Sequence, residues 1–301
     1  MITFDKIKKG LDALYRYYLG DKIVAVYPDI KAKKHRVNLF EYHPERFYDS
    51  DILHNESDVN LGDSLGAVVT SWMLEQKGLS FDMWVKDMKH FNCIGSNVFE
   101  SYQHATIWGA GCLNNPEERK LSFLYKYPFS RFDFRAVRGP LTRDAVLKFG
   151  HKCPVVYGDP AILMPFIYQP KRDKKEGFLV ISQFCKETEF RKKHPDLQMI
   201  SMNTDNYELV IDTIASYDKL VTSSLHGVIL AEAYGIPSVC FRELGKDKDF
   251  KYLDYYYSTG RYDVKIADSF EEALEMEPMP LPDLKSLQDG LLKTFPYDLW
   301  E

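Results

Sequence analysis

The chain of 301 residues has little cysteine and no long apolar run. Its five cysteines stand singly, form no CxxC pair and have no histidine neighbours at zinc spacing. We expect reduced core thiols, with a catalytic cysteine as the open alternative. No apolar stretch approaches the roughly 20 residues that cross a bilayer. The first residues lack the apolar core and cleavage site of a secretory signal, so a cytoplasmic location is predicted.

An excess of charge of one sign is also missing. Lys and Arg number 39 against 44 Asp and Glu, a net charge of −5. That balance argues against a dedicated nucleic-acid binder, whereas small anionic ligands remain open because a few local cations can bind them. A hydrophobic fraction of 45% supplies a packed core and excludes a disordered chain. At about 150 residues per domain, the length predicts roughly two domains.

Residues 4–18 carry apolar side chains at helical spacing, flanked by basic residues. The simpler interpretation is a helix with a solvated outer face. The alternative is at most peripheral contact with an anionic membrane surface, which would place the protein at the inner face of the membrane.

Strand-like and helix-like runs then alternate, a pattern typical of α/β proteins with parallel sheets. The expected strands are 36–40, 105–108, 135–138, 155–157, 178–182, 199–202, 219–222 and 238–241. The expected helices are 64–77, 140–150, 207–216, 225–234 and 284–293. A polar segment at 170–177, with proline at one end and glycine at the other, divides the pattern and is predicted to be an interdomain linker. We predict α/β halves at 1–169 and 178–277, then a proline-rich linker and C-terminal helix at 278–301.

In parallel sheets, ligands bind beyond the carboxyl ends of the strands, and a cleft between the halves is the default place for a site. The segment 222–227, Thr-Ser-Ser-Leu-His-Gly, follows a strand and opens a helix, whose free N–H groups can bind an anion. Ser223 or Ser224 can cap this helix or bind a ligand oxygen. His226, in its first turn, is placed for general acid–base work. The evenly weighted alternative is a structural role for all three side chains.

Two earlier loops have similar positions. Asn60 and Asp63 precede the helix 64–77, where Asp63 is expected as the N-cap; the alternative is that both bind sugar hydroxyls. Gly109 and Gly111 follow a strand and permit close approach of a ligand or of another backbone. The third glycine of a GxGxxG fingerprint is absent, so this loop is weak support for a nucleotide site.

Cations also follow the strands. Arg138 ends a strand and can grip a carboxylate or phosphate with two hydrogen bonds, although a salt bridge to a nearby acid is common for any arginine. Asp159 lies in a Gly-Asp-Pro turn and is a candidate to pair with a basic neighbour. Arg242 and Lys251 belong to a basic, tyrosine-rich stretch that suits an anionic substrate and a sugar, or is simply a solvated loop. No cluster has metal-ligand spacing, so no metal is expected.

Taken together, several segments occur in the order seen in the polysaccharide pyruvyl transferase family. They are 60–65, 109–111, 137–143, 158–161 and 223–237, and the resemblance spans roughly residues 36 to 260. It implies a fold similar to GT-B, with two Rossmann-like domains facing across a cleft. It also implies transfer of a pyruvyl group from phosphoenolpyruvate to sugar hydroxyls, giving a ketal on a cell-surface polysaccharide or its precursor. The donor is then a substrate, and no cofactor is implied.

By position in the family pattern, Arg138 matches the arginine that faces the donor. Leu225 and His226 match the Leu-His pair whose backbone and imidazole approach phosphoenolpyruvate. From the chemistry of that donor we predict that His226 is the acid that protonates its methylene carbon. A sugar or a lipid-linked glycan would be the acceptor.

Ser224 stands where many members of the family have arginine. The cations nearest in sequence that could replace it are Arg242 and Lys251. Two other classes of function stay open: a GT-B glycosyltransferase with a nucleotide-sugar donor, and a catalytically silent carbohydrate-binding protein. Binding of phosphoenolpyruvate rather than a nucleotide sugar distinguishes the first of these.

Overall fold

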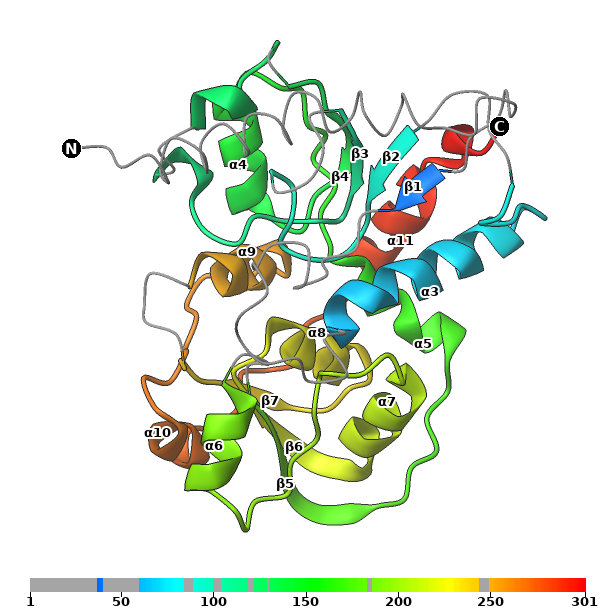
Figure 1. Ribbon diagram of the computed structural model, residues 1–301. Helices are drawn as coiled ribbons and strands as arrows, with labels where there is room; N and C mark the ends of the chain where they lie inside the picture. Colours follow the sequence, from blue (N-terminus) through cyan, green and yellow to red (C-terminus); the bar gives the residue numbers. More distant parts are fainter. Residues whose placement is uncertain are drawn as a thin grey trace, which may run out of the picture.

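The computed structural model describes residues 37–39, 60–83, 89–99, 104–118, 122–128, 130–182, 186–243 and 249–301. These residues form a mixed α/β structure with two parallel sheets and surrounding helices (Figure 1). The predicted α/β class is therefore confirmed. The predicted helix at 4–18 lies outside the described residues.

The first sheet contains the strands in the order β1 (Val37–Leu39), β2 (Lys89–Asn92), β3 (Thr106–Trp108) and β4 (Asp133–Ala136), all parallel. The sequence pattern missed β2, because its Lys-His-Phe-Asn run carries a single apolar residue. The strand expected at 155–157 is reduced to one parallel bridge between Val137 and Tyr157. Here Val155 is exposed, so burial does not support a longer strand.

The second sheet is β5 (Lys175–Ile181), β6 (Tyr217–Thr222) and β7 (Ser238–Cys240), again parallel and in chain order. β5 begins inside the segment that the sequence suggested as a linker. The strand expected at 199–202 is a single bridge between Val180 and Met199. The carboxyl ends of β5, β6 and β7 therefore meet at one edge.

The described α-helices are α3 (Leu61–Glu75), α4 (Pro140–Lys148), α5 (Met164–Ile167), α6 (Glu187–Lys193), α7 (Tyr207–Ser216), α8 (Leu225–Ala233), α9 (Phe250–Ser258), α10 (Phe270–Glu275) and α11 (Lys285–Thr294). Short 3₁₀ helices are η2 (Pro116–Glu118), η3 (Ser122–Tyr125), η4 (Pro160–Leu163) and η6 (Tyr297–Leu299). The sequence predicted α3, α4, α7, α8 and α11. It missed α9, whose run of tyrosines has little helix propensity.

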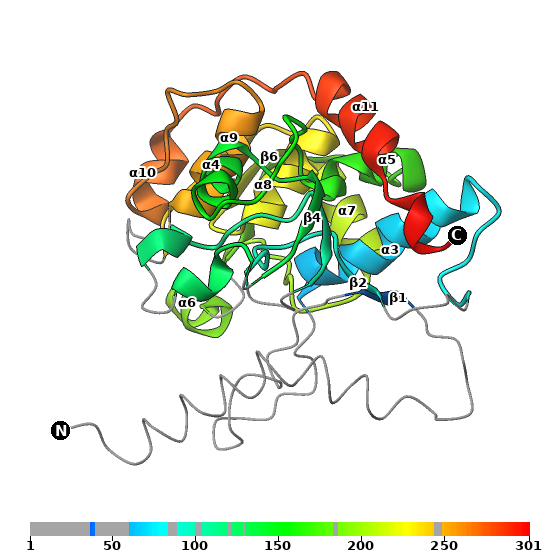
Figure 2. The ribbon, with the colours of Figure 1, turned by 90° about the horizontal axis from the view of Figure 1, so that it is seen from above.

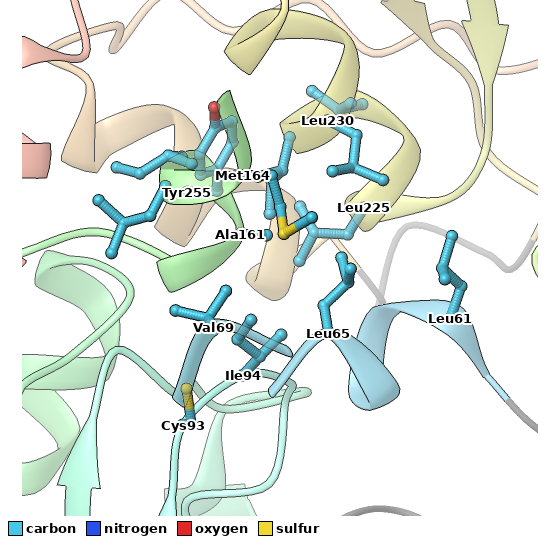
Figure 3. Packing of buried hydrophobic residues seen from close by; sticks show 14 of the residues in the cluster. Leu61, Leu65, Val69, Cys93, Ile94, Ala161, Met164, Leu225, Leu230 and Tyr255 are labelled. Atoms are coloured by element: carbon cyan, nitrogen blue, oxygen red, sulfur yellow. The ribbon is translucent and has the colours of Figure 1, made fainter. Parts of the chain in front are cut away.

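The helices α3, α8 and α9 lie between the two sheets (Figure 1). Their apolar side chains belong to one continuous cluster that also includes η4 and α5. Figure 3 shows Leu65 of α3, Ala161 of η4, Met164 of α5 and Leu225 of α8 converging in this cluster. The described parts of the two halves therefore share a core where the sheets approach each other.

The C-terminal segment returns to the first sheet. The indole N–H of Trp108 in β3 donates to the carbonyl of Leu291 in α11, at 3.1 Å. The hydroxyl of Tyr297 donates to the carbonyl of Met73 in α3, at 3.1 Å, and the C-terminus lies beside α3 (Figure 2). The end of the chain thus covers the sheet formed by its beginning.

Four of the cysteines, Cys93, Cys112, Cys153 and Cys240, are buried and unbridged; Cys185 lies outside the described residues. Burial raises the pKa of Cys153 and of Cys240 to about 12, which keeps these thiols protonated and unreactive. The prediction of core thiols is confirmed for these four. None of the helices in the described ranges has the length and apolarity to span a membrane.

Candidate functional site

The first turn of α8 presents open backbone donors at the carboxyl end of β6. Ser224 is the N-cap, and its Oγ accepts the N–H of Gly227 at 3.3 Å, as the capping interpretation predicts. The N–H groups of Leu225 and His226 have no acceptor among the described residues. The Leu225 side chain points into the core, so its backbone is what it offers to a ligand (Figure 3). This helix start is suited to an anion.

His226 lies against the Gly-Asp-Pro turn of the other half. Its Nε2 is 3.7 Å from Oδ2 of Asp159. Both atoms are buried and have no hydrogen-bond partner within the described residues. The other oxygen of Asp159 caps η4 by accepting the N–H of Ala161 at 3.1 Å. The expected turn is present, and the basic neighbour of Asp159 is His226.

The start of α3 covers the opposite edge of the His226 ring. A Cβ at Gly62 would stand 1.8 Å from Nδ1 and 2.4 Å from Cε1 of His226. The N-cap of α3 is Asn60, whose side chain accepts the N–H of Gly62 at 3.1 Å. The expectation that Asp63 is the cap is wrong: the helix begins at Leu61, which places Asp63 within the first turn, where its charge complements the helix dipole.

Arg138 is completely buried. Its Nη1 donates to Oγ of Ser96 at 2.8 Å, its Nη2 donates to the carbonyl of Cys112 at 2.6 Å, and its Nε lies 3.3 Å from Oδ2 of Asp254. The structure therefore shows the alternative, a salt bridge of Arg138 to a nearby acid, and this pair with Asp254 lies in the interior. Burial raises the pKa of Asp254, while the Arg138 guanidinium and hydrogen bonds from Thr142 act in the opposite direction.

The two glycines after β3 accommodate protein groups. A Cβ at Gly111 would lie 2.4 Å from Cζ of Arg138, and one at Gly109 would lie 2.3 Å from Cδ of Pro160. A Cβ at Gly109 would also lie 2.9 Å from the backbone carbonyl oxygen of Gly158, which is the approach of another backbone that the sequence predicted; at Gly111 the close neighbour is a side chain, which it did not predict. Gly109 thereby seats the turn that carries Asp159 at the end of β3.

α9 connects the Arg138 region with the start of α8. Asp254 accepts the N–H of Thr142 at 2.9 Å and its Oγ1 at 2.7 Å, which holds α9 on α4. The hydroxyl of Tyr252 donates to the carbonyl of Ser223 at 2.6 Å. Lys251 is buried, with its ammonium 4.8 Å from the ring centroid of Tyr252. One helix therefore links residues from both halves of the chain.

Glu243 joins the ends of the second sheet. Oγ of Ser182, after β5, donates to both carboxylate oxygens at 2.8 and 2.9 Å. Oγ of Ser223, after β6, also donates to Glu243. Glu243 and Ser182 have no local signal in the sequence, because their contact depends on strands that become neighbours only in the sheet.

Arg242 lines a cavity next to Glu243. It donates to Asp249 at 2.7 Å and to Asp268 at 2.5 Å, so two carboxylates neutralise it. A cavity of about 270 Å³ lies beside it, lined also by Glu243 and by the rings of Phe190 and Phe270. Residues 244–248 of the basic loop lie outside the described residues. Within the described ranges, no group of three or more His, Cys, Asp or Glu side chains could hold a metal ion.

The fold and the site define the class of protein: an α/β protein with polar loops and a helix N-terminus at the carboxyl ends of parallel strands, where such folds bind ligands. A sequence model of the polysaccharide pyruvyl transferase family matches residues 105–243. The resemblance found from the motifs is confirmed over that segment, and the family is one of transferases.

Two further similarities carry no description of an activity. An uncharacterized protein of Acanthamoeba polyphaga mimivirus is 27% identical over 210 residues, which is 66% of this chain and 70% of that protein. A crystal structure of an uncharacterized protein from Klebsiella pneumoniae subsp. pneumoniae NTUH-K2044 is similar with a TM-score of 0.43 and 12% identity, over 84% of this chain and 99% of that chain.

Proposed function

We propose that this transferase moves a pyruvyl group from phosphoenolpyruvate to hydroxyls of a sugar, in a GT-B-like arrangement of two Rossmann-like domains. The observation that carries the proposal is the start of α8. There an imidazole stands beside two open backbone N–H groups, within a segment that matches the family. This combination suits a donor that needs both an anion site and a proton.

The donor has two anionic groups, a phosphate and a carboxylate. We assign one to the N–H groups of Leu225 and His226, with the hydroxyls of Ser223 and Ser224 beside them. Arg138 would serve the other through Nη1, which donates to the partly buried hydroxyl of Ser96.

A second cation has to replace the arginine that many family members carry where this chain has Ser224. Arg242 already binds two carboxylates. We assign this role to Lys251 for its position: it lies on α9 beside Tyr252, whose hydroxyl donates to the carbonyl of Ser223 at the start of α8.

The chemistry begins when His226 gives a proton to the methylene carbon, and the electron pair of the double bond forms the new C–H bond. The adjacent carbon becomes electrophilic, and a sugar hydroxyl attacks it. Phosphate leaves with the electrons of its C–O bond, and a second hydroxyl closes the ketal. Of the two hydroxyl protons, one returns to His226 and the other leaves with phosphate.

We place the acceptor in the cavity beside Glu243, whose walls carry both carboxylates and aromatic rings. Glu243 accepts a hydrogen bond from Ser223, which connects this cavity with the start of α8. A sugar or a lipid-linked glycan of a cell-surface polysaccharide fits this proposal. A cytoplasmic location, at the inner face of the membrane for a lipid-linked acceptor, goes with it.

The test is to incubate the purified protein with phosphoenolpyruvate and a panel of glycan precursors, and to measure phosphate release and product mass. His226→Ala should lower turnover by about 10²–10⁴-fold while the protein stays folded. Turnover that requires a nucleotide sugar instead of phosphoenolpyruvate would favour the glycosyltransferase. Unchanged turnover in a folded His226→Ala variant would remove the proposed acid.

A further inference from the structure

Asp159 has one carboxylate oxygen more than its local role requires. Capping η4 uses only Oδ1, and an asparagine or serine would cap as well. Its Oδ2 is nonetheless buried in a side chain that is 0% exposed, without a hydrogen-bond partner in the described part of the chain. A buried carboxylate oxygen in that condition is costly and calls for a partner.

The nearest candidate partner is a ring nitrogen of His226, which also lacks a hydrogen bond within the described residues. Nε2 of His226 is also buried without a hydrogen-bond partner in the described ranges, and it faces Oδ2 of Asp159 at 3.7 Å. The separation is slightly longer than a hydrogen bond, and catalytic hydrogen bonds often tighten only when substrate binds. A small rotation of the ring would close it and satisfy both atoms at once.

The Nδ1 edge of the ring packs against the start of α3. Gly62 has no side chain, and any Cβ there would overlap Nδ1 of His226. Since Nε2 is enclosed, the accessible fraction of the imidazole, whose side chain is 11% exposed, lies elsewhere on the ring. The two nitrogens thus have different surroundings: Nε2 faces a carboxylate, and Nδ1 faces a glycine.

We propose that Asp159 is the positioning residue of His226: its Oδ2 accepts Nε2–H, which leaves Nδ1, beside Gly62, as the nitrogen that exchanges the proton with the substrate. The role of Nδ1 rests on the proposed function, whereas the pairing of Asp159 with Nε2 does not. The carboxylate fixes the orientation and tautomer of the ring and complements the imidazolium that carries the proton to be transferred. The motifs that contain Gly62 and Asp159 then both position the imidazole of His226, which belongs to a third motif.

The decisive variant is Asp159→Asn. The amide oxygen can keep the cap on Ala161, while the amide N–H₂ now faces Nε2 and donates to it, which favours the Nδ1–H tautomer. Nitrogen-15 NMR of histidine-labelled protein reports which ring nitrogen carries the proton, and His226→Gln identifies the signal. We expect Nε2–H in the wild type and Nδ1–H in Asp159→Asn, without any donor present.

With phosphoenolpyruvate, Asp159→Asn should lower kcat by about 10²–10⁴-fold and leave KM for the donor nearly unchanged, because the anion site on α8 is intact. An Nδ1–H tautomer in the wild type overturns the proposal, whether or not the variant folds. An unchanged tautomer in Asp159→Asn, or a loss confined to KM, also overturns it. The predicted tautomers in a protein that never uses phosphoenolpyruvate would support the pairing and contradict the proposed function instead.

Discussion

Replacing Arg138 with lysine should destabilise the protein strongly. The guanidinium donates to Ser96 and to the Cys112 carbonyl and lies 3.3 Å from Asp254, all in the interior. An ammonium cannot reproduce this planar arrangement. Losing two charge-assisted hydrogen bonds, at about 1.5–3 kcal/mol each, agrees with the ~3–5 kcal/mol typical of breaking a buried pair. We expect the free energy of unfolding to fall by about 3–5 kcal/mol, out of a typical total of about 5–15 kcal/mol.

The matched control is Arg135→Lys. Arg135 lies in the same strand region and binds Asp298 at 3.0 and 2.8 Å, but its side chain is 33% exposed. Its loss should cost only about 0–1 kcal/mol. Urea unfolding of both variants measures the difference. A loss in Arg138→Lys no larger than in Arg135→Lys would refute the reasoning that burial makes this network stabilising.

The same variant tests the donor role of Arg138, at a temperature where it is folded. One lost charge-assisted hydrogen bond to the donor should weaken use of phosphoenolpyruvate by about 10–150-fold. Donor kinetics equal to the wild type in the folded fraction would assign Arg138 to the structure alone and leave the anion site to α8.

Three further results are expected. Gly62→Ala should lower turnover by about 100-fold because its Cβ displaces the ring of His226, whereas Gly66→Ala in the same helix, whose Cβ meets nothing closer than 3.8 Å, should leave turnover unchanged; comparable kcat values in the two variants would contradict this. Burial, with a smaller contribution from the charge of His104, lowers the pKa of His90 to about 4 from 6.5. Stability is therefore lost as the pH falls below 6.5 towards 4, by about 2 kcal/mol between pH 7 and pH 5, and urea unfolding of His90→Gln should show a smaller loss over that range. Exhaustive chelation should leave activity unchanged; full loss of activity, restored by one divalent ion, would show that the site needs a metal.

The sequence predicted those elements whose signals are local. α7 and α8 follow apolar strands or polar turns, begin after the capping residues Asn206 and Ser224, and were expected at nearly their observed bounds. α6 could not be predicted in this way, because Phe190 is its single apolar residue and a period needs several. The strands expected at 155–157 and 199–202 have suitable residues but too little pairing, and pairing is a property of the sheet.

The candidate site divides along the same line. Ser224 as a cap, and His226 at the start of a helix, followed from a few adjacent residues. Asp254 and Glu243 could not be found from the sequence, since each is defined by partners far away in the chain: Thr142 for one, Ser182 for the other. In a tyrosine-rich run or a loop, the neighbouring residues do not show whether a charged side chain is buried with a partner or exposed to solvent.

The glycines of the motifs explain why those motifs occur together. A Cβ at Gly62 would overlap His226, one at Gly111 would overlap Arg138, and one at Gly139 would stand 1.9 Å from the carbonyl oxygen of Asp254. Each glycine therefore admits a polar residue from another segment at a distance that a side chain would forbid. The requirement is mutual, because a larger residue at any of these positions displaces a group in another segment: His226, Arg138 or Asp254. The identity of each glycine is therefore constrained by its protein neighbour, in addition to any contact with a ligand.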